Sequence, residues 1–344
     1  MSIMKALLLE KYGEFRYVDV ECPVPGAGEV LIRVKACAVC GSDVHGMDGS
    51  TGRRQPPIIM GHEAAGIIEQ CGEGVTDWKP GERVTFDSTI YCGSCPNCLR
   101  GDINLCKYRR VLGVSCDDYR MHGAFAEFIV VPERILYALP EGIEFEQAAM
   151  VEPLAVAYHA AAQVTVLPGD NCVIVGAGTI GLLLLQVLRD MGARVGVIDI
   201  SKDRLETAKA LGAEFCANSS EEDALACVSE YAADGVDITY DAVGITSTVD
   251  LCAKMTRANG SIVLIGNLSK SVELPLQWVV TRQQKLFGSC ASSGEYSKCL
   301  EMIASGKVNV NALITRTVPM AEGGEWIRRL YKKEPGLYKI VMIP

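Results

Sequence analysis

The stretch Asn171-Cys-Val-Ile-Val-Gly-Ala-Gly-Thr-Ile-Gly-Leu-Leu-Leu-Leu-Gln-Val-Leu188 places three glycines between two apolar runs. The run Cys172–Val175 has the length and composition of a buried strand, and the run that begins at Leu182 is typical of a helix. The glycines form the pattern G-x-G-x-x-G, which allows a tight turn, close approach of the backbone to a pyrophosphate, and close packing of strand on helix. This strand–turn–helix context predicts a dinucleotide-binding unit.

The second strand of this unit is predicted to end at Asp199, eighteen residues after Gly181. A carboxylate there accepts hydrogen bonds from the adenosine ribose and repels a 2′-phosphate, which favours NAD over NADP. Because of Lys202 and Arg204, NADP is retained as the alternative cofactor. The other alternative is a purely structural turn in which Asp199 caps the next helix. The N-terminus of the first helix adds free N–H groups and a favourable dipole. The candidate cofactor-binding residues are Gly176, Gly178, Thr179, Ile180, Gly181, Asp199 and Arg204.

Strand and helix patterns alternate through this part of the chain. The predicted strands cover 171–175, 194–198, 236–240 and 261–265, and the predicted helices cover 179–191 and 202–211. Strands that alternate with helices of this length imply a parallel, doubly wound sheet, which is the Rossmann architecture. The alternation of strand and helix patterns ends at about Ser289, so we expect the final segment to return to the first domain.

The first third of the chain instead contains short β-prone runs separated by Gly and Pro turns. Examples are 29–35, 65–69 and 125–131, and a helical, alanine-rich pattern follows between 146 and 162. The predicted fold class is therefore α/β, with an irregular β-rich domain plus a doubly wound parallel-sheet domain. The predicted domain limits are 1–155, 156–289 and 290–344.

Four cysteines, Cys92, Cys95, Cys98 and Cys106, follow the spacing C-x2-C-x2-C-x7-C. Four thiolates on one short loop can close a tetrahedron around Zn²⁺, as in structural zinc sites. Two disulfides are the alternative. It is disfavoured because no secretory segment is visible and the total of 15 cysteines is odd. The spacing therefore predicts a structural zinc lobe.

Three separated fragments offer ligands for a second metal ion. Cys40 lies in a turn, His62-Glu63 follows an apolar run, and Glu152 opens the alanine-rich helical pattern. Cys, His and Glu in one pocket make an open zinc site with a position left for water or substrate. Considered one at a time, Cys40 also fits a buried thiol, His62-Glu63 fits a hydrogen-bonded polar pair, and Glu152 fits a helix cap. Their joint occurrence with the tetrad and the glycine loop favours the metal site.

In chain order, five motifs resemble those of the zinc-containing medium-chain dehydrogenase/reductase family. They are Cys40-Gly-Ser-Asp43, Gly61-His-Glu63, the cysteine tetrad, Glu152-Pro-Leu154 and the glycine loop. The resemblance implies a GroES-like catalytic domain around the β-rich part, two Zn²⁺ per chain and NAD as cofactor. It also implies that Cys40 and His62 bind the catalytic zinc. Glu63 and Glu152 are the remaining candidate ligands, and the choice between them stays open.

The resemblance also implies a proton relay. A secondary hydroxyl bound to zinc becomes more acidic, and hydride then passes to the nicotinamide. Ser42, two residues after Cys40, takes the first proton, and the relay continues through the cofactor ribose to His45. An ordinary surface histidine is the alternative for His45. Asp43 is expected to support the site rather than react.

The branch of the family follows from the same motifs. Cys-Gly-Ser-Asp-Val-His and Glu-Pro-Leu are similar to sorbitol (L-iditol), butanediol and galactitol-1-phosphate dehydrogenases. A polyol or sugar-derived secondary alcohol is therefore the expected substrate. Threonine 3-dehydrogenase-like oxidation is the alternative, which Glu152-Pro-Leu154 disfavours. A non-catalytic NAD- or zinc-binding protein and a zinc-ribbon nucleic-acid binder are the alternatives from other classes.

The amino-acid composition restricts the kinds of molecule that this chain is expected to bind. The 344 residues are 49% hydrophobic and 22% charged, and the net charge of −9 argues against nucleic acid and against a basic membrane anchor. Many free thiols and no visible targeting segment point to the cytoplasm, and the family resemblance implies a homodimer or homotetramer. Arg53-Arg54 could meet an anionic substrate, but a solvated loop pair is the preferred interpretation. His122 and His159 are not assigned a catalytic role.

Overall fold

The computed structural model describes residues 2–116 and 119–344. Within it the chain forms two compact units. The first contains Met1–Glu152, Tyr296–Gly306 and Val310–Pro344, and the second contains Pro153–Glu295 and Lys307–Asn309. The C-terminal segment therefore belongs mostly to the same unit as the N-terminal one.

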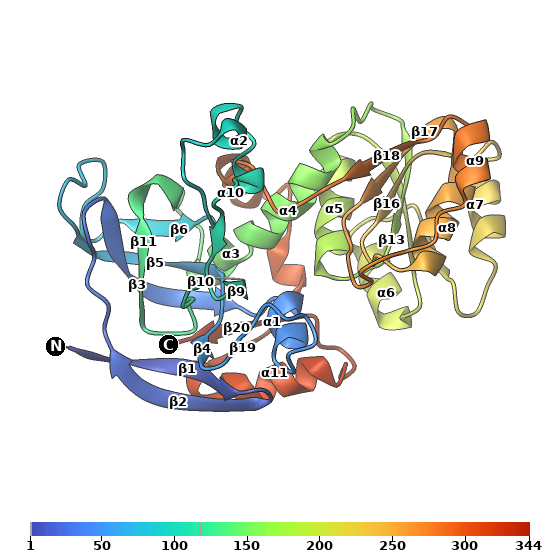
Figure 1. Cartoon of the computed structure of the whole chain (residues 1–344). Helices are drawn as coiled ribbons and strands as arrows, with labels where there is room; N and C mark the ends of the chain where they lie inside the picture. Colours follow the sequence, from blue (N-terminus) through green and yellow to red (C-terminus); the bar gives the residue numbers. More distant parts are fainter. Residues whose placement is uncertain (1, 117–118) are drawn as a thin grey trace. The chain divides into compact units, whose positions relative to one another are not determined.

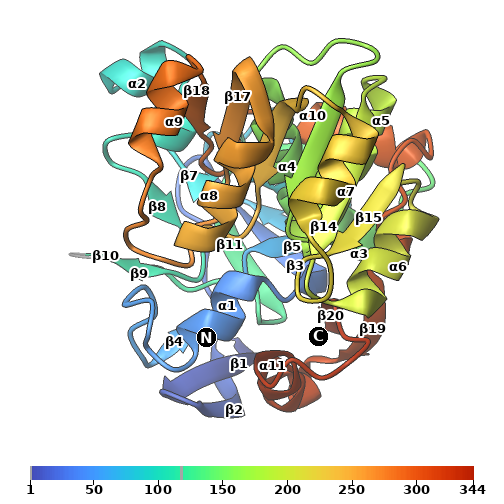
Figure 2. The ribbon, with the colours of Figure 1, turned by 90° about the vertical axis from the view of Figure 1, so that its right-hand side faces the viewer.

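The second unit is built on a six-stranded parallel sheet with the order β15-β14-β13-β16-β17-β18. Helices α5 and α6 lie on one side of the sheet and α7, α8 and α9 on the other (Figure 1), and Figure 2 views the side that α7 and α8 cover. The doubly wound parallel sheet is thus confirmed. The strands are β13 (Asn171–Val175), β14 (Arg194–Asp199), β15 (Phe215–Asn218), β16 (Val236–Asp241), β17 (Thr256–Leu264) and β18 (Lys285–Gly288). The helices are α5 (Thr179–Asp190), α6 (Lys202–Ala210), α7 (Ala224–Tyr231), α8 (Thr246–Met255) and α9 (Leu276–Thr281).

Burial explains why the first strand of this sheet could be predicted. β13 lies between β14 and β16 and has helices on both faces, so Cys172–Val175 is an unbroken buried run. The order of the strands reverses around β13, which places the glycine turn at the topological switch point where open α/β sheets bind ligands.

The first unit contains a seven-stranded sheet with the order β12-β6-β5-β3-β20-β19, and β11 also pairs with β3. Its core combines the buried faces of β3 and β5 with those of β1, β11 and β20. The strands of the unit are β1 (Ile3–Lys11), β2 (Glu14–Glu21), β3 (Glu29–Ala38), β4 (Ile58–Ile59), β5 (Glu63–Cys71), β6 (Arg83–Phe86), β7 (Thr89–Ile90), β8 (Arg110–Val111), β9 (Ser115–Cys116), β10 (Tyr119–Arg120), β11 (Phe128–Pro132), β12 (Leu136–Ala138), β19 (Ile314–Pro319) and β20 (Lys339–Ile343).

Short helices complete this unit. The helical stretch predicted between 146 and 162 is two helices, because α3 (Phe145–Ala149) ends at Met150 before α4 (Val151–Ala162) begins. From Pro153 onward, α4 belongs to the second unit. The other helices are α1 (Gly41–Gly46), α2 (Pro96–Leu99), α10 (Tyr296–Ala304) and α11 (Gly323–Tyr331). Among the described residues, no helix has the length and apolar content that crossing a membrane requires.

One feature of this sheet positions the candidate site. β5 and β20 both run antiparallel to β3, so their first residues lie beside its last ones. Ala38 at the end of β3 is paired with Glu63 and with Val341. Residues just after β3, at the start of β5 and at the start of β20 are therefore brought together.

Candidate active site and zinc lobe

The ends of β3 and β5 bring three of the predicted ligands into one group. Ligand atoms of Cys40, His62 and Glu63 all lie within 4.8 Å of one another. His62 is 6% exposed and Glu63 is fully buried, while Cys40 is half-buried. Burial raises the pKa of the Cys40 thiol, and the charge of Glu63 raises it further. A thiol, an imidazole and a carboxylate gathered in a buried place fit a zinc ion, which would replace the thiol proton.

Glu152 lies in the first turn of α4 and outside this group of three. Its Oε1 accepts a hydrogen bond from the Ser88 hydroxyl at 3.0 Å. Burial raises the pKa of Glu152 to about 7, while His62 lowers it and Glu63 raises it. The structure thus gathers three of the four predicted residues within ligand distance of one another, and Glu152 lies outside that group.

A fifth residue of the site, Lys339, was not predicted. It begins β20 and is 2% exposed. Its Nζ donates to Glu63 at 2.6 and 2.9 Å and to the carbonyl oxygen of Val39 at 3.1 Å. Burial lowers the pKa of Lys339, but Glu63 and Cys40 outweigh burial and raise it above its ordinary value. The only hint in the sequence is a lysine that precedes the apolar run 340–343.

Arg54 was predicted to be solvated, and this interpretation is wrong. Arg53 is exposed, but Arg54 is 2% exposed and its Nη2 donates to Asp43 at 3.0 Å and to the Ser42 hydroxyl at 3.2 Å. Asp43 also accepts the backbone N–H of Cys40 at 3.2 Å. A buried carboxylate requires a charged partner, and Arg54 is that partner. Asp43 therefore anchors the segment that carries Cys40, as expected of a supporting residue.

The two residues of the predicted proton relay lie on one short helix. Ser42 and His45 are in α1, and both are exposed. The backbone N–H of Ser42 donates to Cys40 Sγ at 3.5 Å, which places the relay serine directly beside a candidate ligand. The exposure of His45 suits a residue that exchanges protons with solvent.

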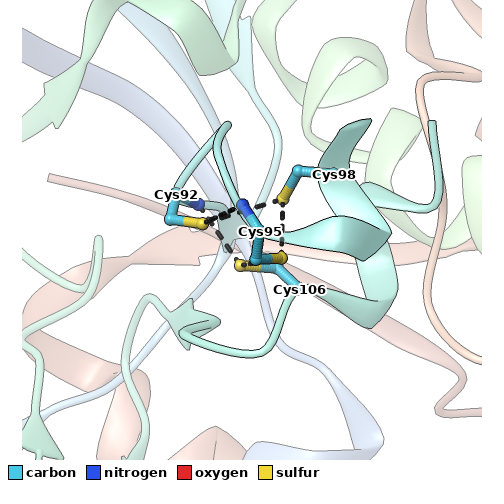
Figure 3. Close-up of side chains that lie close together, drawn as sticks. All are labelled: Cys92, Cys95, Cys98 and Cys106. Atoms are coloured by element: carbon cyan, nitrogen blue, oxygen red, sulfur yellow. Dashed lines mark hydrogen bonds between the residues drawn. The ribbon is translucent and has the colours of Figure 1, made fainter. Parts of the chain in front are cut away.

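The four cysteines of the tetrad point toward one another (Figure 3). Their sulfur atoms lie within 4.8 Å of one another, with 3.5 Å between Cys95 and Cys98. Backbone N–H groups donate to the sulfur atoms, including Ser94 and Cys95 to Cys92 and Tyr108 to Cys106. The N–H of Ser94 lowers the pKa of Cys92 to about 6, which favours a thiolate. Each of the four cysteines is unpaired, so the disulfide alternative is not observed.

The glycine turn of the second unit is closely packed. A Cβ on Gly181 would lie 1.9 Å from the carbonyl oxygen of Gly176, and Gly176 has a φ of +104°. The carboxylate of Asp199 accepts the N–H of Ala177 at 2.6 Å and that of Ser201 at 2.8 Å. Asp199 thus ties the glycine turn to the end of β14, and each of its oxygens retains a lone pair for a ribose hydroxyl. Gly178, Thr179, Ile180 and Arg204 are half-buried.

The two unassigned histidines make structural contacts. His122 Nδ1 accepts the backbone N–H of Ile59 at 3.2 Å. Nδ1 of His159 lies 2.6 Å from Glu295, and its Nε2 lies 3.1 Å from the amide of Gln163. Neither belongs to a group of candidate metal ligands among the described residues.

Two protein-family models match this chain. Residues 26–141 match the family model of the alcohol dehydrogenase GroES-like domain, and residues 179–305 match that of zinc-binding dehydrogenases. D-arabitol-phosphate dehydrogenase of Enterococcus avium is 33% identical over 91% of this chain and 90% of its own. Sorbitol dehydrogenase of Halalkalibacterium halodurans is 31% identical over 99% of both chains.

The chain is also similar to solved structures of dehydrogenases. The chain is 30% identical to the RspB alcohol dehydrogenase of Escherichia coli CFT073, which was solved with NADH, with a TM-score of 0.93 over 100% of both chains.

Proposed function

Because this chain belongs to the zinc-containing medium-chain dehydrogenase/reductase family, in its polyol dehydrogenase branch, we propose that it transfers a hydride between NAD and a secondary alcohol of a polyol or sugar derivative. The observation that carries the proposal is the group of Cys40, His62 and Glu63, whose ligand atoms lie within 4.8 Å of one another. The similarity to an arabitol-phosphate and a sorbitol dehydrogenase supports the substrate class.

In the proposed reaction, the protein groups have separate tasks. When bound, zinc supplies a Lewis acid that makes the substrate hydroxyl more acidic, and NAD supplies the hydride acceptor. Cys40, His62 and a glutamate hold this zinc, and the cysteine tetrad holds a second one. Ser42 would take the proton of the substrate hydroxyl, and exposed His45 would exchange that proton with solvent.

NAD is the proposed cofactor, and the second unit supplies its site. The N-terminus of α5 would supply N–H groups and a favourable dipole to the pyrophosphate. Asp199 would accept the ribose hydroxyls and disfavour a 2′-phosphate, and Arg204 is the further candidate for the adenosine side of the site. The limits 1–155 and 290–344 for the catalytic domain and 156–289 for the NAD domain are part of the proposal.

A cytoplasmic homo-oligomer, either a dimer or a tetramer, is also proposed. Exposed apolar side chains recur between residues 268 and 286, in the segment that contains α9 and the start of β18, the last strand in the sheet order. Such an exposed apolar edge supports self-association. Its exposed residues are Leu268, Val272, Leu274, Leu276, Val280 and Leu286.

The experiment is NADH formation from NAD with polyols, sugar-alcohol phosphates, butanediols and L-threonine, each with and without prior chelation. Turnover of a polyol-like alcohol that chelation abolishes is the expected result. Turnover of threonine alone, or turnover that survives complete removal of metal, would contradict the proposal.

A further inference from the structure

Lys202 is the first cationic residue after Asp199, and in the structure a carboxylate engages it. It begins α6, and a lysine at this place is suited to bind the 2′-phosphate that distinguishes NADP from NAD. Its Nζ, however, lies 3.0 Å from Oε1 of Glu221. Glu221 therefore bears on the choice between the two cofactors.

Strand pairing explains how Glu221 reaches Lys202. β14 and β15 run parallel, and Asp199 at the end of β14 is paired with Asn218 at the end of β15. The N–H of Ser219 also donates to the carbonyl oxygen of Asp199 at 3.2 Å. The turn after β15 therefore lies at the same edge of the sheet as Asp199 and the start of α6, which is the edge where open α/β sheets bind ligands.

Hydrogen bonds hold this turn in a fixed form. The N–H groups of Glu221 and Glu222 donate to the carbonyl oxygen of Asn218 at 2.9 and 3.0 Å. The side chain of Asn218 accepts the N–H of Ser220 at 3.0 Å, and its backbone N–H donates to the carboxylate of Glu222 at 2.7 Å. Asn218 is 6% exposed. The backbone that carries Glu221 is thus anchored on a buried residue.

The three consecutive carboxylates of this turn have different tasks. Glu222 is bonded to the backbone of its own turn, and Asp223 caps α7. Glu221 instead makes its charged contact with Lys202. The two side chains of this ion pair are 68% and 53% exposed, so the pair adds little to stability. Its consequence is the local charge beside Asp199.

We propose that Glu221 is a positioning residue for cofactor choice, which holds Lys202 away from a 2′-phosphate and adds a second negative charge beside Asp199. The proposal rests on the proposed function, in which Asp199 accepts the ribose hydroxyls of NAD. A 2′-phosphate at that ribose would be repelled by two carboxylates, and Lys202 would already be neutralised. Discrimination against NADP is thus shared between Asp199 and Glu221.

The test is the affinity of the zinc-loaded full chain for NADH and for NADPH, measured by fluorescence titration without any alcohol. Glu221→Gln is expected to strengthen NADPH binding at least about fivefold, because Lys202 becomes available to the 2′-phosphate. NADH, which has no 2′-phosphate, should bind within about twofold of its original affinity. Raised salt should reduce the NADPH gain, because an exposed contact is screened. Arg204 is the same in every variant and therefore cannot explain a difference between them.

Three further variants assign the effect to the ion pair. Adding Lys202→Met to Glu221→Gln should remove the NADPH gain, because the cation that meets the phosphate is then absent. Glu221→Asp, which keeps the carboxylate, should retain most of the preference for NADH. Glu214→Gln is the matched control, because Glu214 is an exposed carboxylate that pairs with Arg194 at 3.0 Å before the other end of β15. It should leave both affinities unchanged, and thermal unfolding checks that each variant folds.

Three results would overturn the proposal. They are an NADPH affinity of Glu221→Gln within about twofold of the unmodified protein, an equal gain for both cofactors, and a gain that survives Lys202→Met. The first of these, with NADH binding intact, would overturn the role of Glu221 alone and leave the proposed cofactor standing. An unmodified protein that binds neither NADH nor NADPH would overturn the proposed cofactor together with this role.

Discussion

Arg54 and Asp43 form a second fully buried ion pair next to the candidate zinc site. The side chains are 3% and 0% exposed, and the two charged atoms lie 3.0 Å apart. Asp43 also accepts the N–H of Cys40, so the pair fixes the start of α1 relative to the loop that carries Arg54. Removing one partner of a buried pair costs about 3–5 kcal/mol, because the other charge stays buried and unpaired.

Arg54→Leu is therefore expected to lower the free energy of unfolding by about 3 kcal/mol. Arg53→Leu is the matched control, because Arg53 is the exposed neighbour and should change stability by less than about 0.5 kcal/mol. Urea unfolding of both variants, with metal present, gives the comparison. Equal stabilities for the two variants would show that the Arg54–Asp43 pair does not hold the site together.

Glu295 gives a stability contribution that depends on pH. Burial raises its pKa, but hydrogen bonds from His159 and the Ser293 N–H outweigh burial and lower it below its ordinary value of 4.5. A lowered folded-state pKa stabilises the fold above the ordinary value, and this stabilisation is lost as the pH falls through the folded-state pKa.

Glu295→Gln is accordingly expected to cost about 1–2 kcal/mol of unfolding free energy at pH 7 and progressively less below about pH 4.5. Glu301→Gln, at an exposed position, should show a small effect at every pH. The measurement is urea unfolding between pH 3.5 and 7. A cost that is constant over this range would contradict the role assigned to the Glu295 carboxylate.

The glycine turn between β13 and α5 allows a test of how closely the strand and the helix must pack. A methyl group on Gly181 would meet the carbonyl oxygen of Gly176 at 1.9 Å, whereas a Cβ on Gly178 would meet no atom within 4 Å. Gly178 also has a φ of −74°, which any residue adopts. The strand and the helix can therefore approach this closely only where residue 181 has no side chain.

Gly181→Ala is expected to lower the thermal unfolding midpoint by several degrees and to weaken NADH binding at least about tenfold, because α5 must move away from the turn. Gly178→Ala should leave the unfolding midpoint nearly unchanged. Differential scanning calorimetry and fluorescence titration with NADH give the two values. The prediction is wrong if both alanine variants unfold at the same temperature.

The cysteine lobe has little apolar material to support it. α2 contains no buried residue, and Leu99 and Leu105 are 76% and 50% exposed. A loop without a core depends on its metal ion, because the free energy of metal binding is then its free energy of folding.

Removing zinc from the tetrad should therefore unfold the segment Cys92–Cys106 and leave the six-stranded sheet intact. Hydrogen exchange with mass spectrometry, with and without a strong chelator, measures this. Cys98→Ser should produce the same local loss without chelator, and Cys227→Ser, outside the lobe, is the control. Protection of 92–106 that survives chelation would contradict a structural zinc.

The elements that were predicted correctly depend on residues that are close together in the chain, whereas those that were missed depend on residues far apart. β13 and α5 depend on residues adjacent in the chain, and β13 has its predicted bounds while α5 ends one residue early. β17 begins at Thr256 instead of 261, because residues 257–261 are polar or small and its pairing with β16 is irregular between Thr256 and Ser261. Cys40, His62 and Glu63 were identified together because each stands in a short motif.

The site residues that could not be predicted from the sequence are those whose partners lie far away in the chain. Lys339 contacts Glu63 across 276 positions, and nothing near Lys339 in the chain indicates that partner. Arg54 lies in a loop of polar residues that looks solvated until Asp43 is placed beside it. A buried ion pair is defined by its three-dimensional surroundings, so local pattern does not distinguish it from two surface charges.

At the scale of the whole molecule, the exposed apolar edge near β18 is the basis for the assembly prediction. Leu276→Glu together with Val280→Glu should convert the oligomer to monomers, because each change places a charge in an interface that is otherwise apolar. Ile3→Glu, at an exposed apolar position on β1, should leave the assembly unchanged. Analytical ultracentrifugation distinguishes the cases. A monomeric unmodified protein, or an oligomer that survives both charges, would contradict the prediction.

The convergence of β3, β5 and β20 also has a consequence during synthesis of the protein. Cys40 and Glu63 are made first, but the lysine that neutralises Glu63 is made 276 residues later. At ordinary translation speeds this interval is on the order of tens of seconds. Throughout that time a nascent chain presents a free thiol and a free carboxylate to whatever metal ions surround the ribosome. Exposure of the nascent chain to copper or iron before Lys339 is made should therefore give mismetallated product.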